Sequence, residues 1–153
     1  MKLYLMRHGE ALSADKDPEQ GLTDNGKLNI QKVALQLHKN GVTFNHVLHS
    51  KKKRAQQTAG IMIQTIAPDI TPVLHQHITP NDDPSLIIPE INSWDEDTLI
   101  TSHLPFIPNL ITLLTGIDSY LSAITFETGT VVCLEKTNHS GWGIKWSIAP
   151  SEI

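Results

Sequence analysis

The tripeptide Arg7-His8-Gly9 directly follows a short apolar run, residues 2–6, that is typical of a buried strand. An imidazole can act as a nucleophile, and a guanidinium offers several donors to a tetrahedral oxyanion. A glycine allows the backbone to turn sharply and to approach a ligand closely. Because the same tripeptide also fits a surface arginine beside a structural histidine, it indicates an oxyanion site without establishing one.

A second cluster, HSKKKRAQQTA at residues 49–59, lies where a predicted strand passes into a predicted helix. Lysines at the start of a helix oppose its macrodipole, so Lys51 and its neighbours make sense if an anion binds there. Arg54 lies four residues after Ser50, about one helical turn away, and can point back to the strand end. The alternative is a solvated basic patch. Nucleic acid is disfavoured, since aromatic residues do not alternate with these cations and the net charge is -4.

A third cluster, TSHLP at residues 101–105, places His103 at the end of another predicted strand. The carboxyl ends of parallel strands meet at one edge of a sheet, where ligands gather in open α/β folds. His103 is therefore expected beside His8. A lone histidine before a helix is more often structural, but two strand-end histidines with two arginines favour a shared anion pocket.

The spacing of apolar residues predicts alternating strands and helices up to residue 114, followed by β-rich segments. The predicted strands cover residues 2–6, 44–48, 71–75 and 98–102, and then 124–126, 130–134 and 143–148 as added hairpins. The predicted helices cover residues 25–39, 52–66 and 106–114, with a short helical piece at 85–91. This order predicts a single three-layer α/β/α domain over residues 1–153, with a mainly parallel sheet and antiparallel C-terminal strands.

The composition narrows the remaining possibilities. Cys133 is the single cysteine, which excludes an internal disulfide, and His139 stands where a cysteine phosphatase loop needs an arginine. The chain start lacks the apolar length and cleavage site of a signal peptide, and no stretch is long enough to span a bilayer. We therefore expect a cytoplasmic monomer that binds neither nucleic acid nor membrane. A metal is not expected either, because alternation along strands separates the other candidate ligands: His46, His49, His75 and His77.

Taken together, the motifs resemble those of the histidine phosphatase (phosphoglycerate mutase-like) superfamily, and most closely its short SixA-type phosphohistidine phosphatases. The resemblance rests on MRHGE at residues 6–10, LTDNG at 22–26, the cluster at 49–59, LHQHITP at 74–80 and TSHLP at 101–105. It implies that His8 is the nucleophile, that Arg7, Arg54 and His103 bind the phosphoryl oxygens, and that no metal or organic cofactor takes part. Gly9, Ser50, Lys51 and His77 are the further candidates for substrate binding.

The chain departs from this family pattern at His77, where SixA-like sequences carry a glutamate. An ester needs a proton on its leaving alkoxide, whereas a phosphohistidine can leave as neutral imidazole, so this departure favours phosphohistidine. The short connection between Gln76 and Thr98 leaves no room for a cap and predicts an open site. The predicted substrate is a phosphorylated histidine-containing protein, such as a histidine-phosphotransfer domain. Two alternatives stay open, a phosphatase of small phosphomonoesters and a phosphate-binding docking module without turnover, and His77 is either an acid or a surface histidine.

Overall fold

The computed structural model describes residues 1–116, 124–138 and 141–153, and in these residues strands and helices alternate as far as residue 115. The strands are β1 (Lys2–Arg7), β2 (His46–His49), β3 (Val73–Leu74), β4 (Thr98–Ser102), β5 (Val131–Lys136) and β6 (Trp142–Ile148). The helices are α1 (Asp24–Lys39), α2 (Lys53–Ile66), α3 (Ile88–Ser93) and α4 (Phe106–Thr115), with 3-10 turns at Pro84–Leu86 and Pro150–Glu152.

The strands form one sheet in the order β3-β2-β4-β1-β5-β6. Strands β3, β2, β4 and β1 are parallel, whereas β5 runs antiparallel to β1 and β6 antiparallel to β5. The predicted mainly parallel sheet with antiparallel C-terminal strands is thus confirmed. Strand β4 lies between β1 and β2, so the segments that follow these three strands emerge side by side at one edge.

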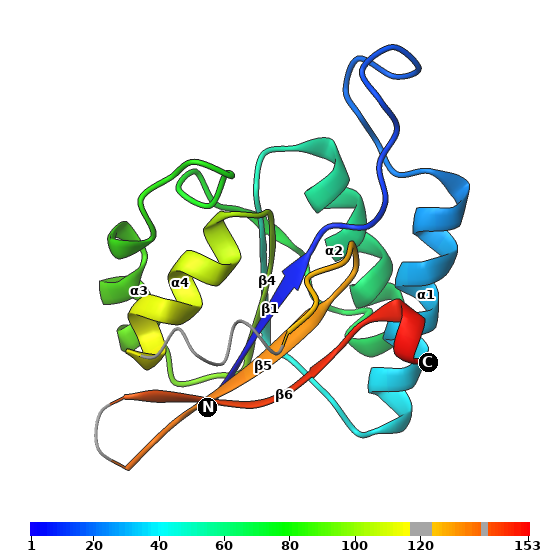
Figure 1. The fold of residues 1–153 in the computed structure, drawn as a ribbon. Coiled ribbons are helices and arrows are strands. Elements are labelled where there is room, and N and C mark those ends of the chain that lie inside the picture. The colour runs from blue at the N-terminus through cyan, green and yellow to red at the C-terminus, as the bar shows by residue number, and fades with distance from the viewer. Residues whose placement is uncertain (117–123, 139–140) are drawn as a thin grey trace.

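Helices cover both faces of the sheet, which gives the predicted three layers (Figure 1). Alternation along β1 explains this, because successive side chains of a strand point to opposite faces. Tyr4 and Met6 pack in one core cluster with residues of α1 and α2, while Leu3 and Leu5 pack in a second cluster with residues of α3 and α4. A strand buried on both faces must be apolar throughout, as residues 3–6 are.

Local signals fix where the long helices begin and end. Thr23 caps α1 by accepting a hydrogen bond from the Gly26 N–H at 2.8 Å. Helix α4 ends at Gly116, which takes the left-handed conformation with φ 72° that an L side chain disfavours. The predicted bounds of α1, α2 and α4 agree with the observed ones to within one residue, whereas the helical piece predicted at 85–91 is a 3-10 turn at Pro84–Leu86 followed by α3.

Two strand predictions were wrong at the edges. Residues 124–126 form no strand, although their β-branched and aromatic composition predicted one. The position beside β1 is taken by β5, and carbonyls of the irregular segment instead accept bonds from side chains of Arg7 and Thr130. The described C-terminal part therefore holds a single hairpin, β5–β6. Strand β3 has two residues instead of five, because β2 offers it only Leu48 and His49 as partners.

Candidate active site

The sheet brings the four residues of the predicted phosphoryl pocket to its carboxyl edge. Arg7 ends β1 and pairs in register with Ser102, and the His8 N–H donates to the Ser102 carbonyl at 3.0 Å. The chain therefore leaves β1 and β4 at the same level, and the ring centroids of His8 and His103 lie 5.1 Å apart. Arg54 is the second residue of α2, and its charge acts on both histidines.

The backbone fixes the tautomer of His8. Its Nδ1 lies 2.7 Å from the carbonyl oxygen of Gly9. Since a carbonyl oxygen only accepts, Nδ1 must carry the ring proton and donate it. Nε2 then holds a lone pair while the ring is neutral, which is the form a nucleophile needs. The sequence alone does not identify this acceptor.

Neither arginine of the pocket has an anionic partner in the part of the chain that the structure describes. Arg7 donates through Nη1 to the Phe126 carbonyl at 2.6 Å, while its Nε is buried without a hydrogen-bond partner. The Arg54 side chain is partly buried and makes neither a hydrogen bond nor an ion pair with the described residues. Partly buried cations are ordinarily paired. Two such guanidiniums beside two histidines form a site suited to an oxyanion.

Burial keeps both histidines neutral at pH 7. It lowers the pKa of His8 to about 4, with help from the charges of Arg54 and Arg7, whereas the hydrogen bond that His8 donates to the Gly9 carbonyl acts in the opposite direction. Burial likewise lowers the pKa of His103 to about 3, with added contributions from His8, Arg54, Lys52 and Arg7. The positive charges of the arginines therefore lower the pKa of both histidines, but desolvation is the larger cause.

Ser50 lies against His103 rather than in the open mouth. Its Oγ is 2.6 Å from His103 Nε2, and both residues are buried. The Ser50 hydroxyl also accepts a bond from the Lys52 N–H at 3.3 Å. The second ring nitrogen of His103, Nδ1, is buried without a partner among the described residues. If the serine donates to Nε2, then Nδ1 carries the proton and His103 is a hydrogen-bond donor.

Thr58 also belongs to this site. It lies in the cluster at residues 49–59, but the sequence predicted no role for it. Its hydroxyl accepts a bond from the Gly9 N–H at 3.0 Å and donates to the Arg54 carbonyl at 2.7 Å. The side chain is fully buried. Thr58 therefore ties the helix that carries Arg54 to the loop whose carbonyl orients His8. The available signal was its spacing of four from Arg54, since helical threonines often bond to the carbonyl four residues back.

The LTDNG motif at residues 22–26 holds the loop that follows His8. The Thr23 N–H donates to the Glu10 carbonyl at 2.9 Å, and its hydroxyl donates to a Glu10 carboxylate oxygen at 2.8 Å. Gly26 lies so close to the Glu10 backbone that a Cβ would collide with it. The start of α1 is thus fitted to this loop, which explains the glycine.

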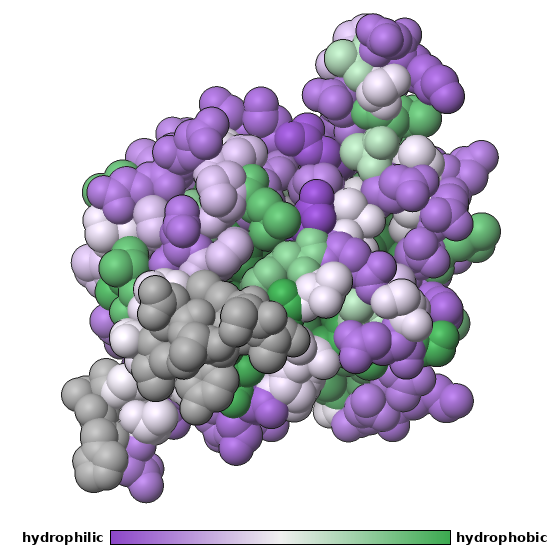
Figure 2. Space-filling model, in the orientation of Figure 1, coloured by the Kyte–Doolittle hydropathy of each residue, from purple (hydrophilic) through white to green (hydrophobic). Residues whose placement is uncertain are grey.

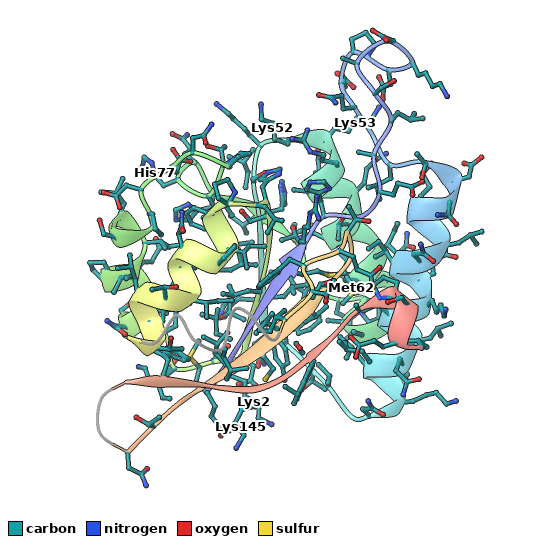
Figure 3. All side chains as sticks on the ribbon, viewed as in Figure 1. Lys2, Lys52, Lys53, Met62, His77 and Lys145 are labelled. Carbon is teal, nitrogen blue, oxygen red and sulfur yellow. The ribbon has the colours of Figure 1, made fainter. Side chains whose placement is uncertain are left out.

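The upper surface of the molecule, in the view of Figure 2, is largely hydrophilic. Lys51 and Lys52 are exposed, whereas Lys53 forms ion pairs with Asp17 and Glu19 at 3.7 and 3.2 Å. Those acidic residues belong to a loop that protrudes above the sheet (Figures 1 and 3). A groove of about 470 Å³ between this loop and the start of α2 is lined by Lys51, Lys52 and Arg54, among others.

His77 lies exposed on the same side of the molecule, after β3 (Figure 3). Its N–H donates to His75 Nδ1 at 3.1 Å, and the two rings lie 5.9 Å apart. His77 and Lys51 both help to lower the pKa of Asp82, after the larger effect of the Thr79 hydroxyl. Within the described residues, no hydrogen bond or ring contact joins His77 to His8 or His103. The structure thus places His77 at the rim.

Among the described residues, no three His, Cys, Asp or Glu side chains lie together as metal ligands would. In the same part of the chain, no helix combines the length and the apolar character needed to cross a bilayer.

The fold and the site define an α/β protein with two histidines and two arginines at the carboxyl edge of its sheet, and known proteins share this fold. Residues 3–76 match the model of the histidine phosphatase superfamily (branch 1). The structure of the protein histidine phosphatase SixA complexed with tungstate has a TM-score of 0.89 at 24% identity, over 99% of each chain. A SixA structure from Agrobacterium tumefaciens has a TM-score of 0.82 at 20% identity, over 97% of each chain. The chain therefore has the SixA fold, and its residues 3–76 match the histidine phosphatase superfamily, as its motifs predicted.

A curated relative matches a smaller region. The mitochondrial serine/threonine-protein phosphatase Pgam5 of Drosophila grimshawi is 38% identical over 65 residues, which are 42% of this chain. The matched region is 22% of that relative, so the chain spans less than a quarter of its length.

Proposed function

We propose that this protein is a phosphatase that removes the phosphoryl group from a histidine on a partner protein, through a phosphorylated His8. The observation that carries the proposal is a neutral His8 with its lone pair at Nε2, next to two guanidiniums without an anion. That combination supplies both a nucleophile and a charged cradle for its target.

In the first step, the lone pair of His8 Nε2 attacks phosphorus and the bond from phosphorus to the substrate nitrogen breaks. The substrate imidazole leaves with that electron pair and is neutral if its other nitrogen carries a proton. Charge spreads over the three equatorial oxygens in the transition state, where Arg7 and Arg54 can donate to them. His103 adds a third donor when Ser50 donates to its Nε2. Water then attacks the phosphorylated His8, releasing phosphate and restoring the neutral ring.

The surroundings of the pocket favour phosphohistidine over an ester. An alkoxide leaving group needs a general acid, and His77, three residues after β3, is a histidine where SixA-like sequences carry a glutamate. The groove beside Arg54 is open to solvent and edged by Lys51 and Lys52, which suits the surface of an acidic protein. Similarity to the SixA structures supports the same substrate class.

A second candidate is a phosphatase of phosphomonoesters, which the likeness to a serine/threonine-protein phosphatase favours. In that case His77 or a solvent molecule would have to protonate the leaving oxygen. A phosphate-binding module without turnover would use the same pocket but would stop before the second step.

The test compares substrates and variants side by side. A histidine-phosphotransfer domain phosphorylated on histidine, a phosphoserine peptide and small phosphomonoesters are each incubated with the wild type, His8→Ala and His46→Ala. We expect release from the phosphohistidine protein, a loss of at least about a thousandfold in His8→Ala, and no change in His46→Ala. Release from esters alone would establish the second candidate, and binding without release the docking module. Full activity in His8→Ala would refute the proposed nucleophile.

A further inference from the structure

A cavity of about 370 Å³ lies at the opposite end of the sheet from the oxyanion pocket. Residues that line it include Tyr4, Leu37, Val42, Asp97, Trp146 and Ile148. Lys2, another lining residue, begins β1 and lies far from Lys52 and His77 (Figure 3). Because β1 rises about 3.3 Å per residue, the cavity and His8 are separated by roughly 15–20 Å. This volume is at the lower end of the range for small-molecule sites.

The hydroxyl of Tyr4 is the first polar group that a ligand could use there. Tyr4 as a whole is 3% exposed, but it lines the cavity, and its hydroxyl makes no hydrogen bond to any described residue. A tyrosine offers an apolar ring and a polar tip, so this hydroxyl can bond to a molecule in the cavity in place of solvent. Tyr4 lines the cavity, and burial together with nearby anions, Asp97 among them, raises its pKa. The phenol is thus a protonated donor at the cavity wall.

Asp97 supplies a half-satisfied acceptor next to that donor. Its Oδ1 accepts a bond from the Lys2 backbone N–H at 2.7 Å. Its Oδ2 makes no hydrogen bond or ion pair with the described residues, although the side chain lines the cavity. The wall thus presents a hydroxyl donor and a carboxylate acceptor that do not bond to each other.

The rest of the wall favours a flat, apolar body. The Trp146 ring lies 5.9 Å from the Tyr4 ring at 49°, and Phe44 contacts the other side of Tyr4 at 5.5 Å. Leu37, Val42 and Ile148 complete the apolar lining. Aromatic walls of this kind accept planar rings by offset or tilted stacking.

We propose that this cavity binds a planar heteroaromatic molecule, of nucleobase type, whose edge carries an N–H donor beside a carbonyl acceptor. The carbonyl accepts from the Tyr4 hydroxyl, the N–H donates to Asp97 Oδ2, and the ring packs against Trp146. The proposal is independent of the phosphatase reaction, since it uses no residue of the oxyanion pocket.

Theophylline and caffeine make a matched pair of probes. Theophylline has an N–H beside a ring carbonyl, and in caffeine a methyl group replaces that hydrogen. Each is titrated into the full chain, and the indole N–H resonances are followed by NMR, with Trp146 assigned through Trp146→Phe. We expect theophylline to shift Trp146 while Trp94 and Trp142, which belong to the core cluster on the other face, stay unchanged. Caffeine should bind about tenfold more weakly.

Variants separate a ligand role from a structural one. Tyr4→Phe keeps the ring contacts and removes a hydroxyl that has no partner, so its unfolding temperature should not fall, whereas theophylline should bind about fivefold more weakly. Asp97→Asn, which can keep the Lys2 contact while replacing Oδ2 with a donor, should weaken binding similarly. His8→Ala should bind the probe like the wild type, even if the proposed phosphatase reaction is wrong. Equal binding of both probes, no shift of Trp146, or unchanged affinity in Tyr4→Phe and Asp97→Asn would overturn the proposal.

Discussion

The ionisable side chains at the two ends of the parallel strands differ in burial and in pairing. At the carboxyl ends, Arg7 and Arg54 are partly buried and have no anionic partner among the described residues. Towards the other end, two pairs of ionisable side chains lie largely exposed, the His46–Glu96 contact at 3.0 Å and the Lys145–Glu135 contact at 3.5 Å. Exposed pairs contribute little to stability, but a partly buried cation without a partner is costly to keep. The difference indicates that the cations at the carboxyl ends are kept for a ligand rather than for the fold.

The largest effect that tests this comparison is expected for Arg54→Met. Removing a donor and a charge from the proposed transition state should lower kcat for the phosphohistidine protein by about a hundredfold to a thousandfold. Arg54→Lys should recover part of the loss, because it restores the charge without the forked geometry. Lys145→Met removes a paired lysine at the other end and should leave kcat unchanged. Similar losses in Arg54→Met and Lys145→Met, at unchanged unfolding temperatures, would remove the distinction between the two ends.

The protonation of the His8 ring tests the charges of the same pocket, and it can be measured without substrate. Its pKa of about 4 means that the ring is neutral above pH 4, and that protonation below this value occupies Nε2 and stops attack. Removing the nearby positive charge in Arg54→Met should raise the pKa of His8, although burial still holds it below its ordinary value. The measurement is an NMR titration of the histidine Cε1–H resonances, with His8 assigned through His8→Ala.

Folding is the necessary control in that titration. The pKa values of His8 and His103 are lowered by folding, so the unfolded chain binds more protons below about pH 6.5. Stability that is complete above that pH is therefore lost gradually as the pH falls towards 4. Circular dichroism at each pH shows whether the chain stays folded. A His8 pKa that is near 6.5 in the folded wild type, or that falls in Arg54→Met, would contradict the prediction.

Most of the fold could be predicted because its signals are local. Apolar periodicity, the Thr23 cap and the Gly116 stop lie in short windows of sequence, and they set α1 and α4 to within one residue. Residues 124–126 could not be placed in this way, because their composition favours a strand while the edge of β1 is already taken by β5. Pairing between segments that are far apart in the sequence decides which segment lies beside β1, and a local sequence pattern carries no information about that pairing.

The site likewise has a part that the sequence predicts and a part that it does not. His8 and His103 could be placed together from two strand ends, since parallel strands present their carboxyl ends at one edge. The hydrogen bonds that hold the two histidines and their loops in place could not be predicted. The bond from the Gly9 N–H to Thr58 joins residues 49 apart, and the one between Ser50 and His103 joins residues 53 apart. Likewise, only the structure distinguishes Lys53, which is held by Asp17 and Glu19, from its two free neighbours.

A smaller effect on kcat is expected from substitutions of Thr58, whose hydroxyl connects Arg54 to the loop of His8. Thr58→Val keeps the shape but leaves the Gly9 N–H without its acceptor, so kcat should fall about tenfold and unfolding should become about 1–3 kcal/mol easier. Thr58→Ser keeps the hydroxyl and should recover most of kcat, despite the small cavity that its missing methyl group leaves. A merely structural role predicts instead that kcat follows stability in both variants. Equal kcat values in Thr58→Val and Thr58→Ser would therefore argue against a positioning role.

The smallest effect is expected at the rim, where Lys51 and Lys52 are exposed and free of ion pairs with the described residues. If they attract an acidic partner, Lys51→Gln with Lys52→Gln should lower kcat/KM for the phosphohistidine protein about threefold to tenfold at low salt. The loss should shrink as salt is raised, and kcat should not change. Lys27→Gln with Lys39→Gln removes the same net charge from the exposed face of α1 and serves as the matched control. An equal loss in both double variants would assign the effect to net charge alone, whereas no loss in either would show that the rim lysines do not steer the substrate.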